Sequence, residues 1–318
     1  MKTFLIFLFA SVLTTIAFAQ NPDKALARVR YSFVHIRDTT AKDKPHTENM
    51  LLVIGKNASV YTSYDKLNRD LETQKQIQEQ LKNQAGSGQM SIKIEKKSST
   101  ILSETDYFYF ANEHKLITKE RLVNNYLIEE DAPKINWKIT KDTASFTGIK
   151  CKKAIAYFKG RNWIAWYATE LPFQSGPWKL NGLPGLIIEA YDDKKEVQFL
   201  FAGMENVKEQ EAITADKKGP EIVVPGATGT VKLIGMDIGS PYLGTEIKLP
   251  GEAIKTTKKE LDKLKEARDK DPQGFMNAQM AANGVQFGGA RQSGTIRTAS
   301  GGQTRNIINN PIELPEKP

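Results

Sequence analysis

The sequence predicts a mainly β protein whose antiparallel strands follow one another in a meander and form an open curved sheet or half-barrel. Short segments that alternate apolar and polar residues dominate the chain from residue 28 to residue 203. Clusters of Gly, Asn, Asp or Lys separate these segments. No helix-length segment lies between the middle strands, which excludes parallel crossover connections among them.

The N-terminal residues predict a signal peptide over 1–19. Lys2 supplies a short basic start, residues 4–16 are mostly apolar, and Ala17-Phe18-Ala19 has the small-x-small pattern of a cleavage site. We expect cleavage after Ala19 and an exported product that is periplasmic or associated with the outer membrane. The mature chain contains no stretch apolar enough to predict a transmembrane span.

Strands are predicted throughout a β-rich domain over 20–250. The predicted strands cover 28–38, 50–54, 58–62, 90–96, 105–110, 115–122, 125–130, 136–140, 149–159, 162–171, 186–192, 196–203, 231–236 and 242–249. One polar helix interrupts them at 65–84, where an apolar stripe follows the helical period. The stripe consists of Leu67, Leu71, Ile77 and Leu81.

The last part of the chain predicts a second surface helix and a tail. Segment 251–283 is charged and helical, with a helix at 257–269 anchored by Leu261 and Leu264. The tail, 284–318, begins with a stretch at 284–302 that has six glycines and no acidic residue, which predicts a flexible segment. The tail ends in a docking motif, in which Ile312 and Leu314 are the apolar contacts.

Charge and cysteine content argue against a nucleic-acid partner and exclude an intrachain disulfide. The net charge is +8, but the lysines are scattered along strands, so neither a basic stripe nor a nucleic-acid partner is predicted. Cys151 is the only cysteine, which excludes an intrachain disulfide. The favoured role of Cys151 is a small buried strand residue, with metal binding or interchain pairing as the alternatives.

The segment 176–188, GPWKLNGLPGLII, packs three turn signals before an apolar strand. Asn181-Gly182 tolerates positive φ, and Pro184-Gly185 suits the centre of a type II turn. Trp178 is one of the apolar residues able to anchor this loop to the sheet. The favoured interpretation is a rigid strand connector; the alternative is that the turn amides form a nest for an anion.

This segment carries a family resemblance. GLPGLI, after the preceding Gly-Pro-x-Lys, is the naming signature of the GLPGLI family of exported Gram-negative proteins, and the match continues upstream to Cys151 and downstream to 310–314. The chain resembles the family from near residue 28 to its end. The resemblance implies a β-rich exported protein associated with outer-membrane receptor systems, and it implies no reaction.

Two carboxylates are the weak catalytic candidates. Glu170 ends one predicted strand and Glu189 interrupts the apolar strand that follows the loop. If these strands are neighbours, the two side chains can converge as general acid and base. The favoured alternative is structural, with Glu170 bonded to turn amides and Glu189 paired with Arg161 or a lysine.

An aromatic stripe is the candidate binding surface. Trp163 and Tyr167 share one face of a predicted strand, and with Trp178 and other aromatic residues they form either an ordinary core or a pocket for a hydrophobic ligand. Four residues of the segment 176–188 complete this candidate set: Asn181, Gly182, Pro184 and Gly185.

The sequence predicts neither a cofactor nor a metal site, because the three histidines, His35, His46 and His114, lie far apart in it. Three functions follow. The favoured one is a non-enzymatic interaction protein that serves outer-membrane proteins. The alternatives are a periplasmic carrier of a lipid or other hydrophobic ligand and, less favoured, a hydrolase that uses Glu170 and Glu189.

Overall fold

The computed structural model describes residues 22–84, 100–207, 222–223, 230–231, 241–251, 253–282 and 308–316. Within these ranges the protein is mainly β, and its large sheet is open, curved and not closed into a barrel. The fold class predicted from the sequence is therefore confirmed. The predicted signal peptide (1–19), the predicted strand at 90–96 and the Gly-rich stretch (284–302) lie outside the described residues.

The large sheet has twelve strands in the order β16-β7-β6-β5-β4-β3-β2-β12-β11-β10-β9-β8. In chain order these strands are β2 (Ala27–His35), β3 (His46–Ile54), β4 (Ala58–Ser63), β5 (Thr105–Phe110), β6 (Lys115–Arg121), β7 (Asn125–Asp131), β8 (Lys138–Phe146), β9 (Ile149–Phe158), β10 (Arg161–Ala168), β11 (Leu186–Asp192), β12 (Val197–Asn206) and β16 (Ile254–Thr256). Two short antiparallel pairs accompany it: β1 (Asp23–Lys24) with β15 (Glu246–Ile247), and β13 (Ile222–Val223) with β14 (Thr230–Val231).

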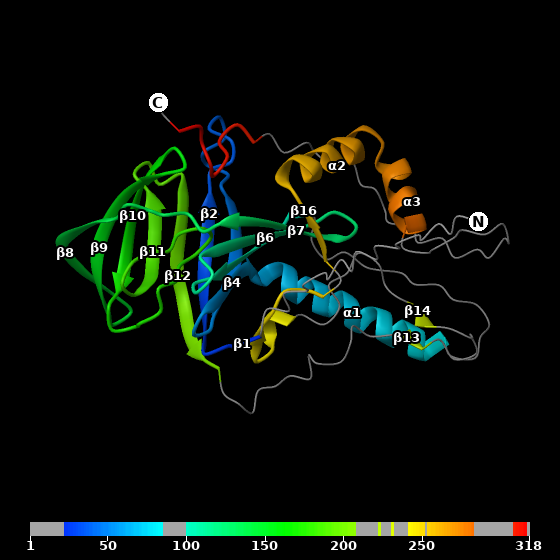
Figure 1. The fold of residues 1–318 in the computed structure, drawn as a ribbon, viewed down its shortest axis with the longest axis horizontal. Helices are drawn as coiled ribbons and strands as arrows, with labels where there is room; N and C mark the ends of the chain where they lie inside the picture. The colour runs from blue at the N-terminus through cyan, green and yellow to red at the C-terminus, as the bar shows by residue number, and fades with distance from the viewer. Residues whose placement is uncertain are drawn as a thin grey trace, which may run out of the picture.

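The sheet consists of two antiparallel meanders, β2–β7 and β8–β12, which meet where β2 pairs with β12 (Figure 1). That seam runs from Val197 opposite His35 to Asn206 opposite Ala27. Among the described strands, the one parallel pair is β7 with β16, a short strand that the sequence did not predict. The expectation of antiparallel strands in the middle of the chain holds, but the chain forms two meanders rather than one.

The connection between β7 and β8 shows how strongly the sheet curves. Nine strands separate β7 from β8 in the sheet, so in a flat sheet they would be about 48 Å apart. Residues 132–137 join them, and a chain of that length reaches at most about 25 Å. The sheet must therefore curl until its two ends approach each other. Ile135 and Trp137 of this connection pack against the main core.

Three helices lie on the side of the sheet away from β8–β12 (Figure 1): α1 (Tyr64–Gln84), α2 (Lys258–Lys270) and α3 (Pro272–Ala282). Thr257 and Glu260 form a capping box at the start of α2. The predicted helical segment 251–283 contains α3 in addition to the one helix that was placed within it, at 257–269. At the start of α3, Asp271 accepts a hydrogen bond from the Gly274 N–H and Pro272 occupies the first helical position, as in many helices. None of the helices in the described ranges is both long and apolar enough to cross a membrane.

Both faces of the sheet are covered near β3. Met50, Leu52 and Ile54 join the main core, which the two meanders share, whereas Leu51 and Val53 join a second core on the opposite face. This alternation follows from the two-residue repeat of a strand. Leu67 of α1 and Tyr242, from the short helix η2 (Pro241–Leu243), belong to the second core. The main core lies on the face where the signature loop packs.

Candidate functional site

Residues 169–185 join β10 to β11 and contain most of the GLPGLI signature; we call them the signature loop. This loop is folded onto the main core. Trp178, Leu180 and Leu183 are buried there. Backbone hydrogen bonds tie the loop to itself and to β11: the Leu186 N–H donates to Leu171 O at 3.0 Å, and the Ile187 N–H donates to Ser175 O at 3.0 Å. The loop is thus an ordered part of the core.

The turn chemistry of the loop differs in one place from the type II turn predicted at Pro184-Gly185. The Gly185 N–H donates to Leu183 O at 2.8 Å, which closes a three-residue turn around Pro184. Gly185 has φ +151, and a Cβ at this position would overlap the carbonyl of Ala168. Gly182 has φ +86, as the Asn-Gly pattern predicts, but open space surrounds it.

The structure does not bring Glu170 and Glu189 together. Glu170 is exposed in the turn after β10, whereas Glu189 is half-buried within β11, opposite Trp166. Glu189 pairs with Trp166, inside β10, whereas Glu170 lies in the turn beyond the end of that strand, so the two carboxylates are not at the same position along the strands. Burial raises the pKa of Glu189, and a hydrogen bond from the Phe201 backbone opposes this shift.

Arg161 is not the partner of Glu189, whereas Cys151 is the buried strand residue that the sequence favoured. Arg161 pairs with Asp192 at 2.7 Å rather than with Glu189. Cys151 is buried on β9, and burial together with the charge of Glu189 raises the pKa of its thiol to about 11. The thiol is therefore protonated at neutral pH and is a poor nucleophile.

The aromatic stripe lies in the main core. Trp163 and Tyr167 are fully buried, and Trp163 donates its indole N–H to Phe158 O at 3.0 Å. The Trp163 ring lies 5.6 Å from the Trp178 ring and 6.0 Å from the Phe199 ring, between ring centroids. Of the two interpretations of this stripe, the structure supports the ordinary core.

A cleft with tyrosines on one wall lies between the signature loop and the sheet. Ser175, Gly176, Trp178, Leu180 and Asn181 of the loop form one wall, and β3–β6 form the other. The sheet wall consists of Leu52, Ser59, Tyr61, Tyr107, Tyr109 and Leu116. Its cavity volume is about 10 Å³, which is room for about one water molecule.

Tyr61, on the sheet wall of this cleft, has an unusual environment. Its side chain is only 3% exposed, yet its hydroxyl has no hydrogen-bond partner. A buried polar group without a partner costs free energy, typically about 1–3 kcal/mol. Such groups are rare in folded proteins, so the hydroxyl is a candidate for contact with a ligand or partner.

Trp178 and Tyr107 line opposite walls of the cleft. Trp178 has φ +56, a left-handed conformation that is strained for an aromatic residue. Burial raises the pKa of Tyr107 well above its ordinary value, and a hydrogen bond donated by the Trp178 indole opposes this shift. The ammonium group of Lys179 lies 5.8 Å from the centre of the Tyr107 ring. Tyr107 is therefore neutral at physiological pH and presents a hydroxyl and a ring face.

Asn181 is a hydrogen-bonded residue of the loop wall of the cleft. Its carbonyl accepts a hydrogen bond from the Trp137 indole at 2.8 Å, and its side-chain amide donates to Lys179 O at 3.1 Å. Through Trp137, the connection between the two meanders is attached to the same wall. Gly182 and Pro184 are exposed beyond it, so of the predicted binding residues only Trp178 and Asn181 line the cleft.

Sequence reasoning missed Tyr61, Tyr107 and Tyr109. The signal was present in β5, where Tyr107 and Tyr109 alternate with Phe108 and Phe110. A two-residue repeat places the tyrosines on one face and the phenylalanines on the other. What the sequence did not indicate is that the signature loop covers the tyrosine face.

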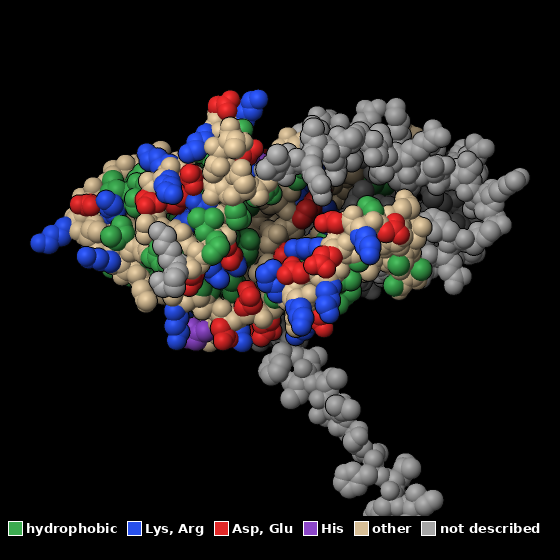
Figure 2. Space-filling view, turned by 90° about the horizontal axis from the view of Figure 1, so that it is seen from above, with side chains coloured by type: hydrophobic (Ala, Val, Ile, Leu, Met, Phe, Trp, Pro, Cys, Tyr) green, Lys and Arg blue, Asp and Glu red, His purple; other side chains and the backbone are tan. Residues whose placement is uncertain are grey.

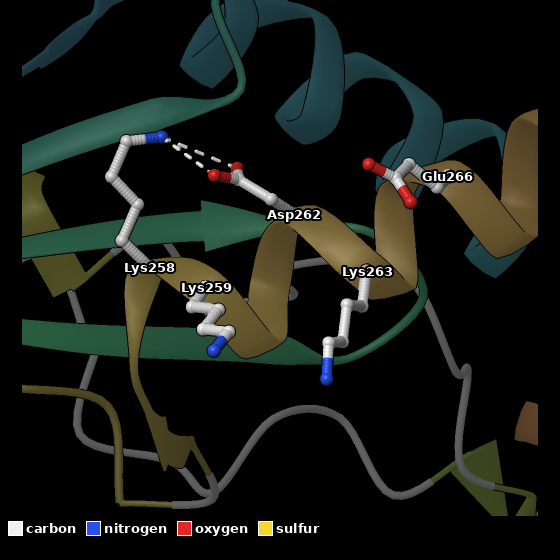
Figure 3. A pocket seen from close by; sticks show the side chains of 5 residues that line it. All are labelled: Lys258, Lys259, Asp262, Lys263 and Glu266. Carbon is white, nitrogen blue, oxygen red and sulfur yellow. Dashed lines mark hydrogen bonds and ion pairs between the residues drawn. The ribbon is translucent and has the colours of Figure 1, made fainter.

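A second depression lies beside α2 (Figure 3). Its lining residues all come from that helix: Lys258, Lys259, Asp262, Lys263 and Glu266. Lys258 binds Asp262 at 2.9 Å, and the other lysines extend away from this pair. Exposed charges on a single helix are typical of a solvated surface, so we do not treat the depression as a site.

Surface charge and metal-ligand geometry add no further site. On the face in Figure 2, lysine, arginine and acidic side chains are interspersed. Within the described ranges, no group of three or more His, Cys, Asp or Glu side chains is placed to hold a metal ion.

No protein-family model and no curated protein matches the chain. Among solved structures, it is similar to PNGF-II in a P21 crystal form, with a TM-score of 0.40 and 11% identity over 60% of this chain and 30% of that chain. For PNGF-II in a C2 form the TM-score is 0.38, with 11% identity over 58% of this chain and 28% of that chain. The chain thus spans less than a third of the length of these structures. Similarity of this size establishes neither a shared fold nor a shared activity.

Proposed function

We propose that this protein is an exported, non-enzymatic binding protein of the cell envelope, related to the GLPGLI family, which recognises an outer-membrane protein partner. The signal-peptide pattern of residues 1–19 and the signature at 182–187 support the location and the family. The tyrosine cleft beside the signature loop is the proposed contact surface.

The unpartnered hydroxyl of Tyr61 is the observation that carries this proposal. It lies in the same cleft as the strained Trp178. Strained backbone and unsatisfied polar groups concentrate at functional sites because a function retains them against their cost in stability. Here the two occur together on opposite walls of one cleft.

The composition of the cleft suits protein recognition. Tyrosine and tryptophan offer large, rigid contact area, and serine, glycine and asparagine offer adaptable hydrogen bonding. The cleft contains all five residue types. A carrier of an acyl chain needs a cavity of roughly 300 Å³ or more. The cleft has no room for an acyl chain, which favours a partner that contacts the residues of the cleft from outside.

The chemistry of the described residues favours binding over catalysis. The hydrolase hypothesis needs two convergent carboxylates, and Glu170 and Glu189 are separated along the strand. Cys151 is a buried thiol with a raised pKa. The neutral tyrosines of the cleft are neither strong bases nor activated nucleophiles at physiological pH.

The free edge of β8 is a weaker candidate for the contact surface. Edge strands can pair with an extended segment of another chain. β8, however, carries Lys138 and Lys141, and its register with β9 shifts between Ile139 and Thr143. Lysines and bulges are the features by which proteins prevent pairing at sheet edges.

Site-specific photocrosslinking in the bacterium that encodes the protein tests the proposal. A benzophenone amino acid replaces Tyr109 in the cleft or, as the control, Tyr157, which is 45% exposed on the other face of the sheet. We expect a discrete protein adduct at position 109 that is absent at position 157 and is at least fivefold weaker when Tyr61→Phe is added.

Two outcomes contradict the proposal. If the same adducts form at positions 109 and 157, the cleft is not a specific contact surface. A lipid adduct at position 109, identified by mass spectrometry, would support the carrier alternative instead.

A further inference from the structure

Arg161 is the centre of a buried cluster at one end of the sheet. It opens β10, next to the ends of β2 and β11, and only 3% of its surface is exposed. One Nη atom donates to Asp192 at 2.7 Å and lies 3.5 Å from Glu196. Asp192 is itself 1% exposed and also accepts the Val197 N–H at 2.9 Å. Arg161 and Asp192 therefore form a buried ion pair within the sheet.

The remaining donors of Arg161 all bind the tail segment, residues 308–316. The second Nη atom donates to Asn310 Oδ1 and to Pro311 O, both at 2.7 Å. Nε donates to Ile312 O at 2.8 Å. The guanidinium group thus donates hydrogen bonds to three consecutive residues of the tail segment, two of them through their backbone carbonyl oxygens.

Other groups of the sheet complete the contact with the tail segment. His35 Nε2 donates to Asn310 O at 2.7 Å, since a carbonyl oxygen can only accept. The Asn310 side-chain amide donates to Ile36 O at 2.8 Å. At the other end, the Leu314 N–H donates to Lys159 O at 3.0 Å. These bonds hold the segment from Asn310 to Leu314, as in a peptide complex.

The contacts select a short sequence. The Asn310 side chain is 4% exposed and both donates and accepts, so an apolar or charged residue in its place leaves buried groups unsatisfied. Glu313 pairs with Lys179 at 2.7 Å and with Lys159 at 3.6 Å. A Cβ at Gly160 would overlap Leu314. The side chains of Asn310 and Glu313 make the selective contacts, so the pattern recognised is Asn-x-x-Glu-x.

We propose that the Arg161 cluster is a peptide-recognition site for segments of this pattern, and that the tail segment of a second copy can replace the chain's own. The site residues named above belong to the sheet or its loops, and the bond from Arg161 to Asp192 involves no residue of the tail segment. Residues 283–307 join α3 to the tail segment, and 25 residues can span up to about 85 Å. That reach allows the segment to enter a neighbouring molecule.

A labelled peptide with the sequence of residues 308–318 tests recognition on full-length chains. The Asn310→Ala chain, whose own tail competes less well, should bind the peptide at least tenfold more tightly than the wild-type chain does. A peptide with alanine at the asparagine position should bind at least tenfold more weakly. If the folded Asn310→Ala chain does not bind the wild-type peptide at millimolar concentration, the recognition site is refuted.

Mixing two full-length variants tests exchange between copies. One variant is Asn310→Ala, with an intact site and a weakened tail; the other is Arg161→Lys, with a weakened site and an intact tail. Each alone should be monomeric in size-exclusion chromatography with light scattering, and the mixture should form dimers.

Gly160→Ala replaces Arg161→Lys if that variant does not fold, because it obstructs Leu314 while every charged group of the site remains. Peptide binding without dimers in the mixture would overturn the assignment to a second copy.

Discussion

His35 shows how one residue makes the tail contact depend on pH. It is 4% exposed and bonded to Asn310 O, and burial lowers its pKa to about 4. The charges of Arg37, Arg161 and His46 lower the pKa further, while the bond to Asn310 raises it. The folded state therefore binds a proton at His35 less readily than the unfolded chain does.

From this shift we predict that the free energy of unfolding falls as pH drops from about 6.5 toward 4. Between these values the unfolded chain carries the proton and the folded chain does not, so acidification favours unfolding by at most about 1.4 kcal/mol per pH unit. Urea denaturation at several pH values measures it. In His35→Gln, which cannot be protonated, most of this slope should disappear; an unchanged slope would assign the effect to other groups.

Two neighbouring tyrosines, whose rings lie 6.4 Å apart, give a matched test of the cleft. The hydroxyl of Tyr31 donates to Ile187 O at 2.6 Å, whereas that of Tyr61 has no partner. We predict that Tyr31→Phe lowers the free energy of unfolding by about 1–2 kcal/mol. Tyr61→Phe should leave it unchanged or raise it by up to about 1 kcal/mol. Equal losses in both variants, measured by urea denaturation, would mean that the Tyr61 hydroxyl already has a stabilising partner.

For single residues, the sequence indicated which side chains are buried better than it indicated which charged side chains are paired. It offered an ordinary core as one explanation of Trp163 and Tyr167, and they are core residues. It offered Arg161 as a partner of Glu189, yet Arg161 is paired with the buried Asp192. Which basic residue faces a given carboxylate depends on strand register, and one sequence does not contain that information.

At the scale of elements, the signature loop tests whether its glycines are structural. Gly185→Ala places a Cβ against Ala168 O at φ +151, so we predict a loss of at least about 2 kcal/mol in the free energy of unfolding. Gly182→Ala, in the same loop at φ +86 but in open space, should lose only about 1 kcal/mol. Denaturant unfolding compares the two; similar losses would show that the close contact with Ala168 can relax.

Elements with a clear period were predictable from the sequence, and short ones were not. β5, β6 and β11 match the predicted ranges to within one residue, because alternation in β5 and the apolar run at 186–188 in β11 are clear strand signals. β16 has three residues, too few to show any period, and it exists because β7 offers it an edge. α3 is weakly amphipathic, so its only sequence signals were Asp271 and Pro272 at its start.

At the scale of the whole molecule, the seam between β2 and β12 was not predictable. It pairs residues more than 150 positions apart, and no local pattern specifies which two strands meet. The short connection at 132–137 reads as an ordinary loop, although it brings the two ends of the sheet together. The curvature of the sheet and the position of the cleft both depend on these two long-range features.

The seam also predicts that the two meanders unfold together. Phe33 of β2 stacks on Phe199 of β12 with ring centroids 5.2 Å apart, and it is 4% exposed in the main core. Phe33→Ala leaves a cavity at this seam and should lower the free energy of unfolding by about 3–5 kcal/mol.

All four tryptophans belong to residues 137–178, so their fluorescence reports the β8–β12 side, and hydrogen exchange of β4–β6 reports the β2–β7 side. Because the main core takes residues from both meanders, both signals should shift by the same free energy. A shift in only one of them would show that each meander is stable without the other, and that the seam is an interface between two folding units rather than the middle of one.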